Sequence, residues 1–120
     1  MSKKILIIDD DEDILEILNI IFQGSGYEVI LSKTSQTTEA IQVIHPDLIL
    51  LDVRIAGSDK SGAEICKELK SKQTTENVPV ILLSGEFNLD IIAKECMADA
   101  FISKPFEVPE LMMQIKRHLS

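Results

Sequence analysis

Tryptophan is absent from the sequence, and cysteine occurs only twice, at Cys66 and Cys96. Both cysteines lie within apolar patterns typical of helices, and neither belongs to a CxxC pair or to a Cys/His spacing that indicates a zinc site. Because disulfides persist mainly in oxidising compartments, we expect two buried, reduced thiols and a cytoplasmic location.

Long hydrophobic runs are also absent. The longest, such as 5–8 and 48–51, contain only a few residues, and the N-terminal stretch has no long apolar core typical of a signal peptide. We therefore expect no membrane span. Basic residues are the scarcer charge, with 12 against 20 acidic residues, and the net charge of -8 repels a phosphate backbone. Direct binding to nucleic acid or to an anionic membrane is not expected.

The sequence does contain five short runs rich in Ile, Leu and Val. The 120 residues, 45% of them hydrophobic, suffice for one core but are too few for two domains. We therefore expect residues 1–120 to form one domain, with no output domain in this chain. The nearly continuous runs are typical of parallel strands covered on both faces. The predicted strands span residues 4–8, 28–31, 48–51, 78–83 and 100–102.

Helix-length segments separate these strands. Ser61 and Glu64 have the spacing of a capping box, and Pro46 ends the second helical pattern. The alternation of strand and helix, repeated five times, predicts an α/β fold with a doubly wound, open five-stranded parallel sheet. Ligands of such sheets bind at the carboxyl ends of the strands. The predicted helices span residues 11–23, 35–44, 61–72 and 88–97, and the last begins near 109.

Polar residues follow four of the five strands, so we expect them to meet at one rim of the sheet. Asp9 and Asp10 follow the first strand, Asp52 the third, Ser84 the fourth and Lys104 the fifth. Clustered carboxylates repel one another unless a hard cation lies among them, and oxygen ligands suit Mg²⁺. The cluster therefore predicts a magnesium site that can also bring a phosphoryl donor to a carboxylate.

Asp52 is the predicted nucleophile of this cluster, because it stands alone at the centre of the sheet edge while Asp9 and Asp10 form a pair suited to the metal. The product is an aspartyl phosphate. Lys104 supplies a positive charge to the phosphoryl oxygens, and the Ser84 hydroxyl donates a hydrogen bond to another of them.

Four motifs in this order resemble the receiver domain of two-component response regulators, and the resemblance covers essentially the whole chain. They are ILIIDDDEDIL, PDLILLD, VPVILLSGE and ADAFISKPF. The resemblance implies a flavodoxin-like (βα)5 fold and a signalling switch rather than an enzyme, apart from catalysis of its own phosphorylation and dephosphorylation.

The resemblance also assigns roles to individual residues. It implies Mg²⁺ binding by Asp9, Asp10, Asp52 and the backbone carbonyl of Arg54, and phosphorylation of Asp52. Ser84 and Lys104 match the switch hydroxyl and the phosphate-sensing lysine, Phe101 matches the aromatic switch position, and Pro105 implies a cis Lys104–Pro105 bond.

The implied partners are proteins. A histidine kinase, a phosphotransfer protein or a small acyl phosphate donates the phosphoryl group, the kinase side docking near the first helix. A downstream effector or output domain contacts the face made by the fourth helix, fifth strand and fifth helix. Met113, Lys116 and Arg117 are candidate exposed contacts on that face.

Two features depart from the family pattern. The loop after Asp52 lacks the usual proline and is two residues longer before Gly62, which we expect to loosen it and to affect the lifetime of the phosphorylated state. Met97 replaces the usual glycine after the fourth helix, so we expect that helix to end in a different geometry.

Structural interpretations remain open beside the functional ones. Asp11, Glu12 and Asp13 fit an acidic helix start without any metal. Ser84 also fits a helix cap or turn, and Phe101 fits plain core packing as well as a switch.

Two rival functions also remain. A metal-dependent phosphohydrolase lacks an evident second acid here, and Asp52-Val53-Arg54 does not match the Asp-x-Asp of haloacid-dehalogenase-like enzymes. The second rival function is that of a pseudo-receiver, which binds partners without being phosphorylated.

Overall fold

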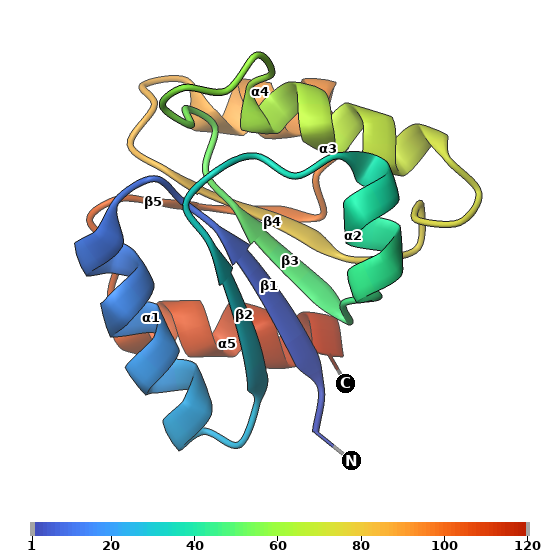
Figure 1. Ribbon diagram of the computed structural model, residues 1–120. Coiled ribbons are helices and arrows are strands. Elements are labelled where there is room, and N and C mark those ends of the chain that lie inside the picture. The colour runs from blue at the N-terminus through green and yellow to red at the C-terminus, as the bar shows by residue number, and fades with distance from the viewer. Residues whose placement is uncertain (1, 120) are drawn as a thin grey trace.

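The five predicted strands are all present in the computed structural model, which describes residues 2–119 (Figure 1). They pair in parallel in one sheet with the order β2-β1-β3-β4-β5. This confirms the predicted α/β fold with an open parallel sheet. The strands are β1 (Lys4–Ile8), β2 (Glu28–Ser32), β3 (Leu48–Leu51), β4 (Val80–Ser84) and β5 (Ala100–Ser103).

Five helices connect and follow the strands, as the sequence predicts. The second begins three residues later than expected, because the Thr37 hydroxyl caps it by accepting a hydrogen bond from the Ala40 N–H. The fourth is shorter than expected and has no side-chain hydrogen bond at its cap residue Asn88. The helices are α1 (Glu12–Gly24), α2 (Thr38–Ile44), α3 (Gly62–Ser71), α4 (Leu89–Glu95) and α5 (Val108–Leu119).

Two helical layers cover the sheet, with α1 and α5 on one face and α2, α3 and α4 on the other (Figure 1). In β1, Ile5 and Ile7 point toward the α1/α5 layer, while Leu6 and Ile8 point toward the opposite one. The side chains of a strand alternate between the two faces of a sheet, so a strand covered on both sides needs apolar residues throughout. This explains the continuous apolar runs of β1, β3 and β4.

Helix caps place the segments that leave the sheet rim. Asp11 caps α1, and its Oδ1 accepts hydrogen bonds from the N–H groups of Asp13 and Ile14. Glu12 and Asp13 lie in the first turn, which confirms the acidic helix start. The capping box of Ser61 and Glu64 is also confirmed.

The end of α4 contradicts the expectation for Met97. This residue has a φ of 63°, so the chain adopts the left-handed conformation that glycine usually supplies after a helix. The conformation usual for a glycine at this position of a helix end is kept, and the methionine backbone takes the strain of that conformation instead.

Both cysteines are free and buried, as predicted. No helix among residues 2–119 combines the length and the apolar character needed to cross a lipid bilayer.

Candidate functional site: an acidic cluster with a bridging lysine

The register of β1 and β3 brings two aspartates together at the carboxyl rim of the sheet. Ile8 pairs with Leu51, so the next residues along the two strands are Asp9 and Asp52. The backbone N–H of Asp52 donates to the Ile8 carbonyl at 2.9 Å, which carries the pairing one residue beyond β3. β2 lies on one side of these two central strands and β4 on the other, so the strand order reverses between β1 and β3. Open α/β sheets bind ligands at such a reversal.

Asp9, Asp10 and Asp52 form a carboxylate cluster. One oxygen from each lies within 4.8 Å of the others. Asp9 and Asp52 are buried, with 1% and 7% of their surface exposed, whereas Asp10 is exposed. The cluster therefore combines negative charge at a half-enclosed rim with an opening to solvent at Asp10.

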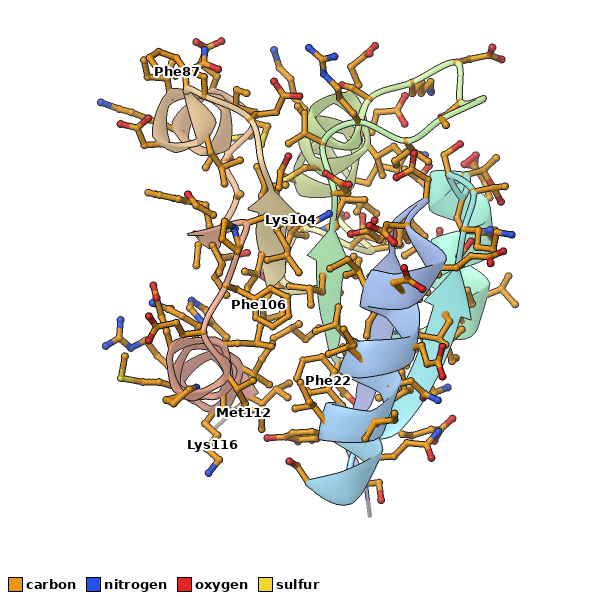
Figure 2. The ribbon with its side chains drawn as sticks, turned by 90° about the vertical axis from the view of Figure 1, so that its left-hand side faces the viewer. Phe22, Phe87, Lys104, Phe106, Met112 and Lys116 are labelled. Atoms are coloured by element: carbon orange, nitrogen blue, oxygen red, sulfur yellow. The ribbon has the colours of Figure 1, made fainter. Side chains whose placement is uncertain are left out.

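Lys104 neutralises part of this charge. Its Nζ donates to Asp9 Oδ2 at 2.7 Å and to Asp52 Oδ2 at 3.1 Å. Figure 2 shows the lysine reaching from the segment after β5 toward the end of β3. Burial alone lowers the pKa of the Lys104 amine, but the hydrogen bond to Asp9 and the charges of both aspartates outweigh this and raise it. Lys104 is therefore held as a cation between two carboxylates.

For Asp9, burial outweighs the contacts that favour the ionised carboxylate. It raises the pKa of the Asp9 carboxyl, even though Lys104 and the Asp11 N–H, which donates to Oδ1 at 3.0 Å, both favour the ionised form. The nearby charge of Asp52 raises it further. Ionised Asp9 is thus costly to the fold in the absence of a further cation.

Asp52 presents its two carboxylate oxygens to different neighbours. Oδ1 accepts the N–H of the next residue, Val53, at 2.7 Å, and Oδ2 faces Lys104. This division fixes the orientation of the side chain, because one oxygen is tied to the backbone.

The longer loop after β3 is tied to this cluster. The Ala56 N–H donates to Asp10 Oδ2 at 3.0 Å, and the side chain of Ile55, in the same loop, is buried in the hydrophobic core. Ser58 closes a turn, since its N–H donates to the Ile55 carbonyl at 3.1 Å. The added length is accommodated in a hydrogen-bonded turn. Its effect on phosphate lifetime stays a prediction.

Two contributions to this rim are not evident in the sequence analysis. The first is Gly62, at the start of α3. A Cβ there would lie 1.8 Å from the carbonyl oxygen of Asp52. The Gly62 N–H also donates to the Val53 carbonyl at 2.7 Å. The only available signal was the glycine itself, which often marks a close approach of two backbones.

The second is an ion pair between the Arg54 and Glu86 side chains, which links the loops after β3 and β4. The Arg54 side chain is 84% exposed and that of Glu86 is 21% exposed. For Arg54 the sequence resemblance implied only a role of the backbone carbonyl in metal binding, which stays a prediction. Two long side chains from separate loops give no spacing signal in the sequence.

Ser84 and Phe101 lie on adjacent strands. Ser84 is at the rim, whereas Phe101 pairs with Leu82, two residues before the end of β5. Ser84 is buried at the end of β4, and its carbonyl accepts the Lys104 N–H at 2.9 Å. Its hydroxyl accepts the Glu86 N–H at 3.4 Å, in keeping with the turn interpretation. The core-packing interpretation of Phe101 is wrong, because this side chain is 43% exposed while the neighbouring Ile102 is buried. The predicted cis Lys104–Pro105 bond is confirmed.

The fold and the rim together define a class of protein. The family model for the response regulator receiver domain matches residues 5–116. The chain therefore belongs to the receiver domains of two-component response regulators, which are in general signalling proteins rather than enzymes.

Relatives agree with this assignment. The chain is 37% identical over 119 residues to the phosphate regulon transcriptional regulatory protein PhoB of Pseudomonas aeruginosa, covering 97% of this chain and 51% of that protein. It is 36% identical over 122 residues to sporulation initiation phosphotransferase F of Bacillus subtilis, covering 99% of this chain and 95% of that protein. The chain thus spans about half the length of PhoB and nearly all of the sporulation protein.

A solved structure is also similar. The crystal structure of a response regulator from Chloroflexus aurantiacus superimposes with a TM-score of 0.86 at 31% identity, covering 99% of this chain and 98% of that chain. This agreement confirms the flavodoxin-like arrangement of the sheet and helices.

Proposed function

We propose that this domain is a phosphorylation-activated switch that accepts a phosphoryl group on Asp52. The observation that carries the proposal is the position of Lys104, whose Nζ contacts both Asp9 and Asp52 at the carboxyl rim of the sheet. A cation fixed beside a buried carboxylate is suited to receive the negative charge of a phosphoryl group. Membership of the receiver family supports the same chemistry.

The donor set at this rim fits Mg²⁺. Asp9, Asp10 and Asp52 supply hard carboxylate oxygens within 4.8 Å of one another, and the exposed side of Asp10 leaves room for the waters that Mg²⁺ retains. We expect the backbone carbonyl of Arg54 to complete the protein ligands. When bound, Mg²⁺ supplies charge neutralisation of the carboxylates and of the phosphoryl oxygens.

The residues of the chain perform the transfer. An oxygen of Asp52 attacks phosphorus, the new O–P bond forms, and the bond to the donor breaks as its electron pair leaves with the donor group. Oδ1 is tied to the Val53 N–H, so Oδ2, which faces Lys104, is the expected nucleophile. Lys104 then transfers its contact from the carboxylate to the phosphoryl oxygens, where it stabilises the added charge.

The proposed output passes from Ser84, at the end of β4, to Phe101 on the adjacent strand β5. Ser84 is the neighbour expected to hydrogen-bond a phosphoryl oxygen, and this draws the loop after β4 toward the rim. We expect exposed Phe101 on β5 to respond by changing its orientation, so that the face of α4, β5 and α5 alters its affinity for a partner. Met113, Lys116 and Arg117 are exposed on α5 and suit such a contact.

The proposed donors are a histidine kinase, a phosphotransfer protein or a small acyl phosphate in the cytoplasm. The relative named as a sporulation phosphotransferase consists almost entirely of the matched region, whereas PhoB is about twice as long. The proposed downstream partner is an effector protein or an output domain. The net charge of -8 argues against direct contact with nucleic acid through this domain.

The test is the intact mass of the purified chain after incubation with a small acyl phosphate, with and without Mg²⁺. We expect one phosphoryl group per chain, requiring both Mg²⁺ and Asp52. Asp52→Asn keeps the shape and the acceptor for Val53 but removes the nucleophile, and Asp59→Asn, in the exposed part of the same loop, is the matched control.

Other outcomes of this experiment indicate one of the two rival functions. A folded chain that binds Mg²⁺ but gains no mass from the acyl phosphate or from a cognate kinase is a pseudo-receiver. Sustained release of inorganic phosphate from many substrates, with no accumulated adduct, indicates a phosphohydrolase.

A further inference from the structure

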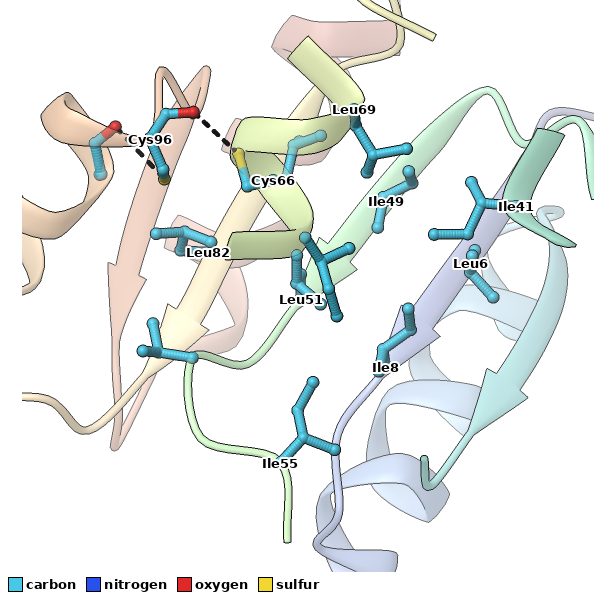
Figure 3. Close-up of a cluster of buried hydrophobic side chains, with 14 of the residues drawn as sticks. Leu6, Ile8, Ile41, Ile49, Leu51, Ile55, Cys66, Leu69, Leu82 and Cys96 are labelled. Carbon is cyan, nitrogen blue, oxygen red and sulfur yellow. Dashed lines mark hydrogen bonds between the residues drawn. The ribbon is translucent and has the colours of Figure 1, made fainter. Parts of the chain in front are cut away.

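The two cysteines lie together between α3 and α4, away from the acidic cluster. Cys66 lies within α3, and Cys96 directly follows α4, 30 residues later in the chain. The Cys66 Sγ–H donates to the Cys96 carbonyl at 3.4 Å, and the Cys96 Sγ–H donates to the Ala93 carbonyl at 3.6 Å (Figure 3). The proposed function uses neither thiol.

The environments of the two sulfurs differ. The adjacent Cys96 side chain, together with burial, raises the pKa of Cys66, while the adjacent Cys66 side chain lowers the pKa of Cys96. The thiolate is the form that reacts with oxidants and disulfides. Cys96 is thus suited to react first, and Cys66 lies beside it as a second thiol.

A groove gives small molecules a route toward Cys96. Its volume is about 210 Å³, and it lies between α3 and α4. Cys96 lines it but is only 3% exposed, so attack on its sulfur requires a small local opening. The groove is lined by Ala63, Glu64, Lys67, Ile92, Glu95 and Cys96.

The helix that precedes Cys96 has few features that resist such an opening. α4 has seven residues, and its cap residue Asn88 makes no side-chain hydrogen bond to it. Only Leu89 and Ala93 are buried within the helix. Short helices depend on tertiary packing, and segments with few buried contacts open locally at low cost in free energy.

We propose that Cys66 and Cys96 form a peroxide-sensitive modification site that closes to an intramolecular disulfide between α3 and α4. The Cys96 thiol loses its proton, the thiolate attacks one oxygen of hydrogen peroxide, and the O–O bond breaks. The hydroxide that leaves takes up that proton, so a sulfenic acid and water result. The Cys66 sulfur then attacks the Cys96 sulfur, the S–S bond forms, and a second water leaves. The two thiols together lose two electrons, and the peroxide gains them.

The disulfide restrains α4. It fixes the C-terminal end of this helix to α3, while the N-terminal end follows the loop that carries Glu86 beside Ser84. Oxidation therefore limits how far α4 can move relative to α3. This inference does not depend on phosphorylation, so the Asp52→Asn chain is expected to oxidise like the wild type.

The test begins with the reduced, folded chain treated with hydrogen peroxide, quenched, and alkylated with N-ethylmaleimide after unfolding. We expect a monomer lighter by two hydrogen atoms, without alkylation, and a proteolytic fragment in which Cys66 and Cys96 are linked. A chain that stays fully alkylated, that gains oxygen without losing hydrogen, or that links only between molecules overturns the proposal. The wild-type mass decides this whether or not any variant folds.

Two single variants and one exchange measurement test the order of events and the restraint. Cys66→Ala is expected to accumulate oxygen on Cys96, whereas Cys96→Ala is expected to keep Cys66 as a thiol. Faster oxidation of Cys96→Ala than of Cys66→Ala contradicts the assignment of Cys96 as the first site. Hydrogen exchange across residues 89–96 is expected to slow several-fold in the oxidised chain, and unchanged exchange contradicts the proposed restraint.

Discussion

Gly62 and Asp52 lie in backbone contact, so that a Cβ on Gly62 would lie 1.8 Å from the Asp52 carbonyl oxygen. The start of α3 is therefore pressed against the residue proposed to accept phosphate. Both atoms in conflict belong to the backbone or are fixed to it, so no side-chain rotation can relieve the clash. The glycine stabilises the site by permitting this approach.

Gly62→Ala is expected to lower the free energy of unfolding by about 3 kcal/mol, since the clash displaces either α3 or the end of β3. Urea denaturation measures this. Gly24→Ala is the matched control, because a Cβ there meets nothing within 4 Å. A Gly62→Ala variant as stable as the control contradicts the inferred contact.

Lys104→Met is expected to destabilise the metal-free chain, because it leaves ionised Asp9 and Asp52 facing each other without the cation that contacts both. Breaking a buried ion pair costs several kcal/mol, and the partial exposure of Lys104 reduces this to about 2 kcal/mol here. The free energy of unfolding is measured in the presence of a metal chelator, which keeps the chain metal-free. Exposed Lys94→Met is expected to change stability by less than about 0.5 kcal/mol, and equal effects of the two variants overturn the explanation.

Asp9→Asn is expected to stabilise the metal-free chain at neutral pH. Burial raises the pKa of Asp9, so the folded state holds a proton more tightly than the unfolded state, and ionised Asp9 is a cost above that pKa. As the pH falls through the folded-state pKa, the wild type regains this stability and the advantage of the variant shrinks. Chelator-treated samples unfolded across an acidic pH series measure the difference. A variant less stable than the wild type at neutral pH contradicts the sign.

Met97→Gly is expected to stabilise the chain by about 0.5–1 kcal/mol, because glycine adopts the φ of 63° without steric cost. Met113→Gly is the matched control, since both methionines are 54% exposed but Met113 lies within α5. There the same substitution is expected to destabilise by about 1 kcal/mol. Thermal unfolding of both variants gives the comparison, and shifts of the same sign contradict the role assigned to φ.

Glu86→Gln is expected to increase the rate of phosphorylation by an anionic small donor a few-fold, with little change in stability. The substitution removes a negative charge near the rim and frees Arg54 from its ion pair, so both changes favour approach of an anion. An ion pair whose Arg54 partner is 84% exposed contributes little to folding. The rate enhancement should decline with added salt. Glu76→Gln, in the loop after α3, is the control, and equal rates for the two variants contradict the electrostatic explanation.

The strands and most helices could be predicted from the sequence because their signals are local. The continuous apolar runs require two covered faces, and caps such as Asp11 and Ser61 lie within three residues of the groups they bind. The helix starts that were missed, as at Thr38, depend on a competing capping hydrogen bond. The position of Phe101 was ambiguous because β5 is an edge strand with one partner, which leaves a large side chain room to remain exposed.

The sequence by itself determined the order of elements and the ends of the strands, and hence that Asp9, Asp52 and Lys104 meet at one rim. Parallel pairing makes that convergence a consequence of chain order. Only the tertiary structure decided that Gly62 contacts Asp52, that Arg54 pairs with Glu86, and that Cys66 lies beside Cys96. These contacts depend on how helices and loops pack against one another, and packing distances of a few ångströms between distant segments have no periodic signal in the chain.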